Sequence, residues 1–133
     1  TSGGNYNVVV GDEAGTALTT GDANVAVGFE ALKTEDAHGQ NTALGYIALK
    51  NLNAGANGNN VAVGFSAGTA MTTGVQNTIV GASAGDALTD ADYNVAIGME
   101  ALSTDTLGSK STAVGKGTLK NQNFVKFDAD YPI

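Results

Sequence analysis

The chain of 133 residues contains no cysteine and no tryptophan, a single proline and only 6 basic residues. The absence of cysteine excludes disulfide bonds and thiolate chemistry. Because 13 acidic residues outweigh the basic ones and give a net charge of −7, the composition argues against nucleic acid and anionic membranes as partners. No apolar run approaches the roughly 18 residues that a membrane-spanning helix needs. We therefore expect neither nucleic-acid binding nor membrane insertion.

Charged and aromatic residues are also scarce, at 14% and 6% of the chain. An ordinary domain has about 25% charged residues. The apolar content is mainly Ala, Val and Leu, so the core that this chain can build is thin. A thin core leaves a chain of this size marginally stable on its own. We expect self-association to supply additional buried area.

The chain is rich in one five-residue phrase, Asn-x-Ala-x-Gly. Seven copies start at steps of 17 residues, except for a step of 19 between the third and the fourth copy. A period of this regularity predicts a solenoid of about seven coils, each close to 17 residues long. The residues that open the copies are Asn7, Asn24, Asn41, Asn60, Asn77, Asn94 and Ser111.

We number each repeat from this first residue, which is position 0. Position +1 is Val or Thr, +2 is usually Ala, +3 is always aliphatic and +4 is always Gly. Such a run predicts a strand of four or five residues with +1 and +3 on one face and +2 on the other. We expect stacked coils to bury the aliphatic columns. The Gly predicts a turn with positive φ or a close approach of the next coil.

A second pattern follows the strand. Position +7 is Ala in six copies, and then two subtypes alternate. Three copies have Gly at +8 and an apolar residue at +11, whereas four have Leu at +8 and mostly polar residues at +11. This alternation predicts one core slot that is filled from either position. A single helical turn would bring two positions three apart to the same side.

The repeats divide the chain into a lead-in at 1–6, a solenoid at 7–120 and a cap or connector at 121–133. The opening Thr1-Ser2-Gly3-Gly4 is expected to belong to a piece of a longer protein. The third repeat carries two extra residues within 53–59, and an insertion in a solenoid maps to a surface loop.

The phrase Asn-x-Ala-x-Gly followed by x-x-Ala resembles the head repeats of YadA-like trimeric adhesins. The stretch 41–49 also looks like repeats in phage tail-fibre and long bacterial fibre proteins, and the resemblance covers 7 to about 120. It implies an all-β, left-handed parallel β-roll or β-helix-like solenoid, with three chains intertwined or side by side as a homotrimer. It also implies an extracellular fibre on a cell surface or virion tail. The repeat here is longer than that of the family, and the Gly/Leu alternation at +8 departs from it.

Position +5 is the most informative variable column. Its middle members are large and apolar, and its ends are charged. Such a stripe either packs against a neighbouring chain or is offered to a ligand. We favour the trimer interface, with Phe29, Tyr46, Phe65 and Met99 as its residues.

Glycan binding uses aromatic faces and a few fixed polar groups. The candidates outside the regular columns are Tyr6, Asn57, Asn59, Tyr93 and Tyr131. Each alone is better explained as a packing residue or a solvated one, and only the resemblance to adhesins favours a ligand role.

Two pairs of carboxylates make weak candidates for a calcium site. Asp90 and Asp92, and likewise Asp128 and Asp130, lie two residues apart and are followed by Tyr. Calcium takes several oxygen ligands from a flexible loop. The glycine and distal glutamate of an EF-hand loop are missing, so ordinary acidic turns are the alternative. No other cofactor is indicated.

Catalysis has little support in the sequence. His38 is the only histidine and lies in a polar, turn-like segment, where a solvated role is expected. Ser66 and Ser83 share position +6 with glutamates of other repeats, which is typical of a surface column. We therefore expect no enzyme.

The leading hypothesis is a non-enzymatic, trimeric fibre head domain that attaches to a cell-surface glycan or receptor. A pure structural spacer of a fibre is the alternative. An ice-binding solenoid would need a Thr-x-Thr ladder, and a tailspike hydrolase would need paired carboxylates in a groove. Neither pattern recurs along the chain.

Overall fold

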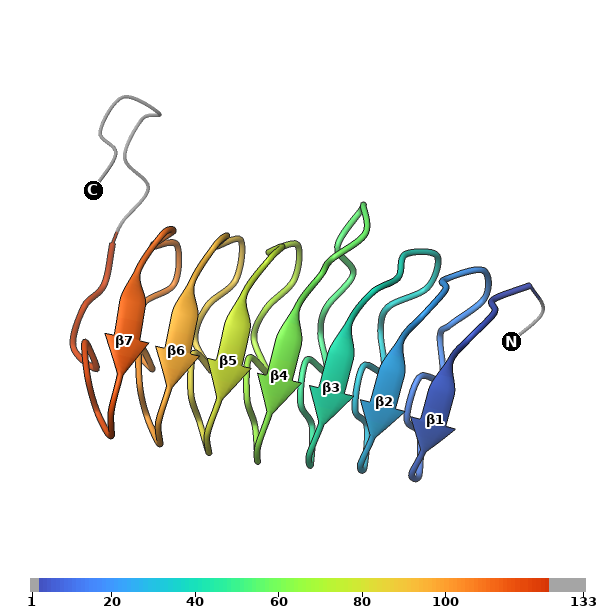
Figure 1. Cartoon of the computed structure of the whole chain (residues 1–133), viewed down its shortest axis with the longest axis horizontal. Coiled ribbons are helices and arrows are strands. Elements are labelled where there is room, and N and C mark those ends of the chain that lie inside the picture. The colour runs from blue at the N-terminus through green and yellow to red at the C-terminus, as the bar shows by residue number, and fades with distance from the viewer. Residues whose placement is uncertain (1–2, 125–133) are drawn as a thin grey trace.

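Each repeat folds into one coil of a β-solenoid, and each coil contributes one strand (Figure 1). The computed structural model describes residues 3–124. All seven strands are parallel and form one sheet in sequence order. The predicted all-β solenoid with a period of about 17 residues is therefore confirmed. The strands are β1 (Val8–Val10), β2 (Val25–Val27), β3 (Thr42–Leu44), β4 (Val61–Val63), β5 (Thr78–Val80), β6 (Val95–Ile97) and β7 (Thr112–Val114).

The strands hold three residues rather than the four or five that we predicted, and their faces are used differently. Position +2 points inward, so that Ala26 in β2 and Ile79 in β5 are completely buried. Positions +1 and +3 point outward, and Val10 and Leu44 at +3 are 59% and 44% exposed. The expectation that the +3 aliphatic column lies in the core is wrong. Side chains alternate along a strand, and the inward asparagine at position 0 assigns the inward side to +2.

The asparagines at position 0 form a buried ladder along the solenoid. Asn60, which is buried, accepts a hydrogen bond at Oδ1 from the backbone N–H of Asn77 in the next coil (2.9 Å). Its Nδ2 donates to the carbonyl oxygen of Gly74 in the turn that closes its own coil (2.9 Å). Asn77 and Asn94 repeat both contacts. Each of these three amides thus holds a turn of its own coil and links that coil to the next.

The predicted two-way core slot is found in some coils and not in others. At Gly85 an added Cβ would lie 2.9 Å from Cδ1 of Leu88 at +11, so the +11 side chain takes the space beside this Gly. In the other subtype the +8 side chains themselves are buried, as Leu32 and Leu102 show. In the third coil, however, Leu49 at +8 and Leu52 at +11 are both fully buried, so the two positions do not exclude each other in every coil.

No helical turn brings these positions together, because the described residues contain no helix. Instead, the backbone N–H of Leu88 donates to the carbonyl oxygen of Gly85 (3.1 Å) in a tight turn. The +8 residue is left-handed in both subtypes, with φ of 52° at Gly85 and 56° at Leu102. A left-handed residue bends the chain sharply, which a coil of this small circumference requires.

The glycine at +4 meets both conditions that we predicted for it. Gly45 has φ 141°, and a Cβ there would collide with the carbonyl oxygen of Gly64 in the next coil. The insertion also lies where expected. The loop before β4 projects beyond the other loops on that side (Figure 1), and residues 55–57 are exposed.

We predict that replacing one ladder amide destabilises the whole solenoid. Asn60→Ala leaves the N–H of Asn77 and the carbonyl of Gly74 without these partners, which should lower the free energy of unfolding by about 2–4 kcal/mol. Urea unfolding followed by circular dichroism measures the loss. Asn51→Ala is the matched control, because Asn51 is exposed and its amide makes one bond, to Thr69 O. Equal losses for the two variants would contradict a special role for the ladder.

We also predict strong coupling between positions +8 and +11. Gly85→Leu should destabilise by about 1–3 kcal/mol through overpacking, and Leu88→Ala by about 2–4 kcal/mol through a cavity. The double variant should recover at least about 1 kcal/mol of the summed loss, because the leucine side chain introduced at +8 takes the space vacated at +11. A double-mutant cycle in urea measures the coupling. Additive losses would show that the two positions do not share a slot.

Candidate functional site

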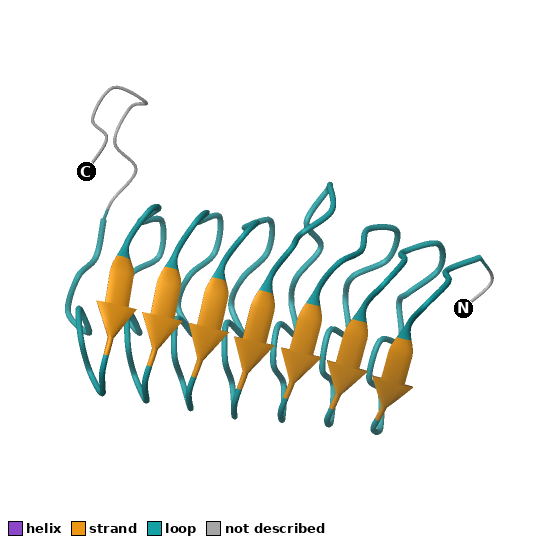
Figure 2. Ribbon diagram, in the orientation of Figure 1, coloured by secondary structure: helices purple, strands orange, loops and turns teal. Residues whose placement is uncertain are grey.

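The outward face of the sheet is the most extensive apolar surface of the described chain. Its two central columns, at +1 and +3, are made of Val, Thr, Leu and Ile side chains, and the strands carry them in register over seven rows (Figure 2). With rows about 4.8 Å apart and strands of three residues, about 10 Å long, the strand part of the face covers roughly 300 Å². The largest apolar patch on a typical monomer is about 300–600 Å² and is often functional.

The predicted interface residues at +5 do form one stripe along this face. The rings of Phe29, Tyr46 and Phe65 stack with centroids 5.3 and 5.1 Å apart and interplanar angles of 15° and 5°. They are 37%, 47% and 57% exposed, and Met99, two coils after Phe65, is 42% exposed. Parallel exposed rings in successive coils make an ordered apolar edge. Whether another chain covers it remains a prediction.

The other edge of the face is the column at position −1. Its members are exposed and have left-handed backbones, with φ between 51° and 64°. This edge is a corner of the coil, where the chain turns into the strand. The residues are Tyr6, Ala23, Gln40, Asn59, Gln76, Tyr93 and Lys110.

The candidate glycan residues are not gathered into one site. Tyr6, Asn59 and Tyr93 share the −1 column but lie in different rows, and the two tyrosines are 89% and 48% exposed. Asn57 belongs to the insertion loop, where its Oδ1 accepts a hydrogen bond from the N–H of Gly39 (3.2 Å). Tyr131 lies outside the described residues.

Beside the aromatic stripe, Glu and Lys side chains link neighbouring coils. Lys33 pairs with Glu13 and with Glu30 (2.6 Å), and Lys50 also reaches Glu30 (2.6 Å). Hydrogen bonds from Lys33 and Lys50 lower the pKa of Glu30 below its ordinary value. Because the Lys33 and Lys50 side chains remain about one-third exposed, solvent screens the pairs and they add little stability. They supply a charged border to the apolar face.

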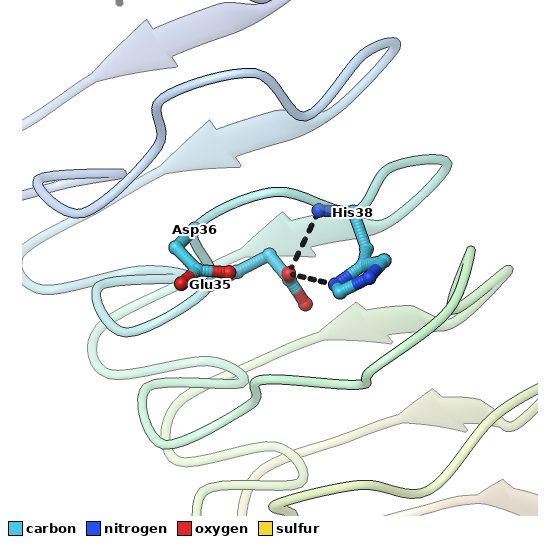
Figure 3. Close-up of side chains that lie close together, drawn as sticks. All are labelled: Glu35, Asp36 and His38. Carbon is cyan, nitrogen blue, oxygen red and sulfur yellow. Dashed lines mark hydrogen bonds and ion pairs between the residues drawn. The ribbon is translucent and has the colours of Figure 1, made fainter.

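A buried carboxylate that the sequence did not reveal lies at position +11 of the second coil (Figure 3). Glu35 is fully buried, and its two oxygens accept hydrogen bonds from the backbone N–H groups of His38 and Ala54 (3.1 Å each). Nδ1 of His38 lies 3.3 Å from the nearer oxygen, although without the alignment of a hydrogen bond. The predicted solvated role of His38 is therefore wrong in part, because its ring rests against Glu35.

Asp105 occupies the same position in the sixth coil and makes the same kind of contacts. It is fully buried and accepts hydrogen bonds from the N–H groups of Gly108 (2.9 Å) and Phe124 (3.1 Å). In both coils the carboxylate holds a turn of its own coil and the chain of the next one. In the sequence, the feature that could have indicated these buried carboxylates is an acidic residue at +11 in a repeat that has Leu at +8.

The calcium candidates are used in contacts between coils. Asp90 accepts a hydrogen bond from Oγ1 of Thr73 (2.6 Å), and Asp92 accepts one from the N–H of Val75 (2.8 Å). Asp128 and Asp130 lie outside the described residues. Within residues 3–124, three side chains lie close enough together to share a metal ion, namely Glu35, Asp36 and His38. The hydrogen bonds of Glu35 give that group a structural role.

No described helix is long and apolar enough to cross a membrane. Comparisons of the chain with protein-family models, with curated proteins and with solved structures find no match. The resemblance to adhesin and tail-fibre repeats therefore rests on the residues of the repeat alone.

We predict that Glu35→Gln lowers the stability of the folded chain, although the glutamine side chain has nearly the same shape as that of glutamate. Glutamine offers one carbonyl oxygen and one amide donor, so one of the two buried N–H groups loses its acceptor, at about 1–3 kcal/mol. Thermal unfolding measures the loss. The control is Asp36→Asn, because the Asp36 carboxylate accepts no hydrogen bond from the described residues. A larger effect of the control would contradict the structural role of Glu35.

Proposed function

We propose that this chain is a non-enzymatic fibre module that forms a homotrimer through the outward face and presents loops for attachment to cell-surface glycans. The observation that carries the proposal is the flat apolar face along the whole solenoid. The strands offer roughly 300 Å² of the ~800 Å² that each partner contributes to a standard protein interface, and the exposed +5 stripe beside them adds to it. The thin core of alanine supplies a second argument, because association adds the buried area that a single chain lacks.

The resemblance of the repeats to trimeric adhesin heads favours three copies, whose outward faces would turn toward one central axis and enclose a narrow prism. The +1 and +3 side chains would fill this prism. Three rods lying side by side in this way make the stiff unit that a fibre needs.

Attachment is assigned to the surfaces that such an assembly leaves open. The insertion loop at 53–59 projects from the solenoid and exposes amides, Gly55 and the small Ala56 rather than large apolar side chains. Three copies of a weak site gain avidity without new contacts. The resemblance of the repeats to adhesin heads supports a glycan as the ligand. A spacer within a fibre is the second candidate, favoured by the absence of a converging site among the described glycan candidates.

We predict that Leu44→Asp abolishes both assembly and attachment. The side chain is 44% exposed within one chain, so folding should change by less than about 1 kcal/mol, whereas a carboxylate inside the closed prism is costly. Light scattering should give three times the 13.2 kDa chain mass for the unmodified protein and one times for the variant. Thr20→Asp, at an exposed turn, is the control and should remain trimeric.

Binding to a glycan array separates the two candidate functions. The trimer should bind with at least about 100-fold higher apparent affinity than Leu44→Asp, through loss of avidity. A trimer that binds neither the array nor intact cells would establish the spacer. A stable monomer at micromolar concentration would overturn the proposal.

A further inference from the structure

The insertion loop rests on the turn that begins at Glu35 in the second coil. Oε2 of Glu35 accepts a hydrogen bond from the N–H of Ala54 (3.1 Å), near the start of the loop. The N–H of Gly39 donates to Oδ1 of Asn57 (3.2 Å), and its carbonyl oxygen accepts from the N–H of Gly58 (3.0 Å). A group that fixes this turn would therefore also fix the loop that projects from the solenoid.

This turn carries more polar side chains than its structural role requires. In the sixth coil, Asp105 accepts the same two kinds of backbone hydrogen bond as Glu35, one from its own coil and one from the next. That coil has threonine at +12 and glycine at +14, whereas the second coil has Asp36 and His38 there. A carboxylate alone can therefore hold such a turn, and the additional acid and imidazole need another explanation.

The imidazole of His38 presents an unused nitrogen to the buried carboxylate. Nδ1 is buried and has no hydrogen-bond partner among the described residues, although the side chain as a whole is 30% exposed. It lies 3.3 Å from Oε1 of Glu35 without the alignment of a hydrogen bond. Zinc binds nitrogen and carboxylate oxygen at about 2.0–2.1 Å, so two of its tetrahedral ligands lie about 3.3–3.4 Å apart. The observed separation therefore suits two ligands of one ion.

Both carboxylates have lone pairs left for a metal ion. A carboxylate offers about four lone-pair sites, and backbone N–H groups use two of those on Glu35. The carboxylate of Asp36 accepts no hydrogen bond from the described residues. One ligand atom from each of Glu35, Asp36 and His38 lies within 4.8 Å of the other two. Figure 3 shows the carboxyl group of Glu35 between the Asp36 side chain and the His38 ring. Rotation of the Asp36 side chain would bring all three ligands onto one ion.

We infer that Glu35, Asp36 and His38 bind a divalent transition-metal ion of the zinc type, with water completing the coordination. One imidazole and two carboxylates are ligands that zinc accepts, whereas calcium takes about six to eight oxygens. The ion also offsets the cost of burying the charge of Glu35, with which no lysine pairs among the described residues. The inference goes beyond the proposed function and does not depend on the trimer. It gives the insertion loop a base that becomes more rigid when the ion binds.

Zinc binding can be assigned to this site by mutation, because the chain has one histidine and no cysteine. Calorimetric titration of the full chain, prepared without a histidine tag and at neutral pH, should show one zinc ion per chain with a dissociation constant in the micromolar range or below. His38→Gln and Asp36→Asn each remove a ligand and should weaken binding at least about 10-fold. Circular dichroism checks that both variants retain the solenoid.

The matched control removes a carboxylate elsewhere. Asp90→Asn changes an exposed turn three coils further along the solenoid and should bind zinc as the unmodified chain does. Binding that survives His38→Gln, or that requires millimolar zinc, would be adventitious and would overturn the inference. Tighter binding of calcium than of zinc would overturn it as well. These outcomes are independent of the trimer and of glycan binding, which light scattering and the glycan array measure separately.

Hydrogen exchange tests whether the bound ion acts on the loop. With zinc at about ten times its dissociation constant, exchange of the amides of Ala54 and Gly58 should slow about 10-fold, because local opening must release the ion. The same amides should not respond to zinc in His38→Gln. The amide of Gly108, which donates to Asp105 in the equivalent turn of the sixth coil, is the internal reference. Equal slowing of this reference, or no slowing in the loop, would overturn the role that we give to the ion.

Discussion

The hydrogen bonds of the position 0 asparagines are the interaction on which this solenoid depends. Most of these side chains, as Asn60 does to Gly74, donate to the turn that closes their own coil and so hold that turn at the start of the strand, whereas Asn41, before the insertion, donates to Gly39 instead. Each also accepts the N–H of the next asparagine, as Asn60 does from Asn77, and so sets the register between coils. A buried amide that loses its partners costs about 1–3 kcal/mol, which makes a slip of one residue unfavourable in every coil.

The inward asparagine also decides what the rest of the strand can do. Because side chains alternate, position +2 must point inward beside the amide, where the coil has room for Ala and, in β5, for Ile79. Positions +1 and +3 must then point outward, although they carry the larger aliphatic side chains. Volume in the core comes instead from the slot shared by +8 and +11. The result is a coil that is narrow inside and apolar outside, which is why its outward face is the first place to look for function.

The period predicted much of this fold and less of the candidate site. Seven copies at a step of 17 define the strands, their parallel order and the surface position of the insertion, because every coil repeats the same constraint. The direction of the +3 column was not predictable from hydrophobicity, since Val27 is more apolar than the alanine beside it and yet points outward. Glu35 was also missed, because the N–H group of Ala54 that satisfies it lies 19 residues further along the chain. The sequence arranged the +5 residues in a column, but only the structure shows that the rings of Phe29, Tyr46 and Phe65 stack along it.

The irregular residues matter because the regular ones carry no information about register between chains. If all rows were identical, two neighbouring copies would pack equally well after one copy moved along the rod by one coil. When copies that meet through unlike edges are staggered in this way, the ring of copies does not close, and the assembly grows into an open filament. A feature that occurs in one row only removes this degeneracy. The +5 column varies along the rod, from the stacked rings of Phe29, Tyr46 and Phe65 to Ala82 and Met99, so a shift of one coil changes which residues face one another. The regular columns thus build the rod, and the variable +5 column distinguishes a level neighbour from a staggered one.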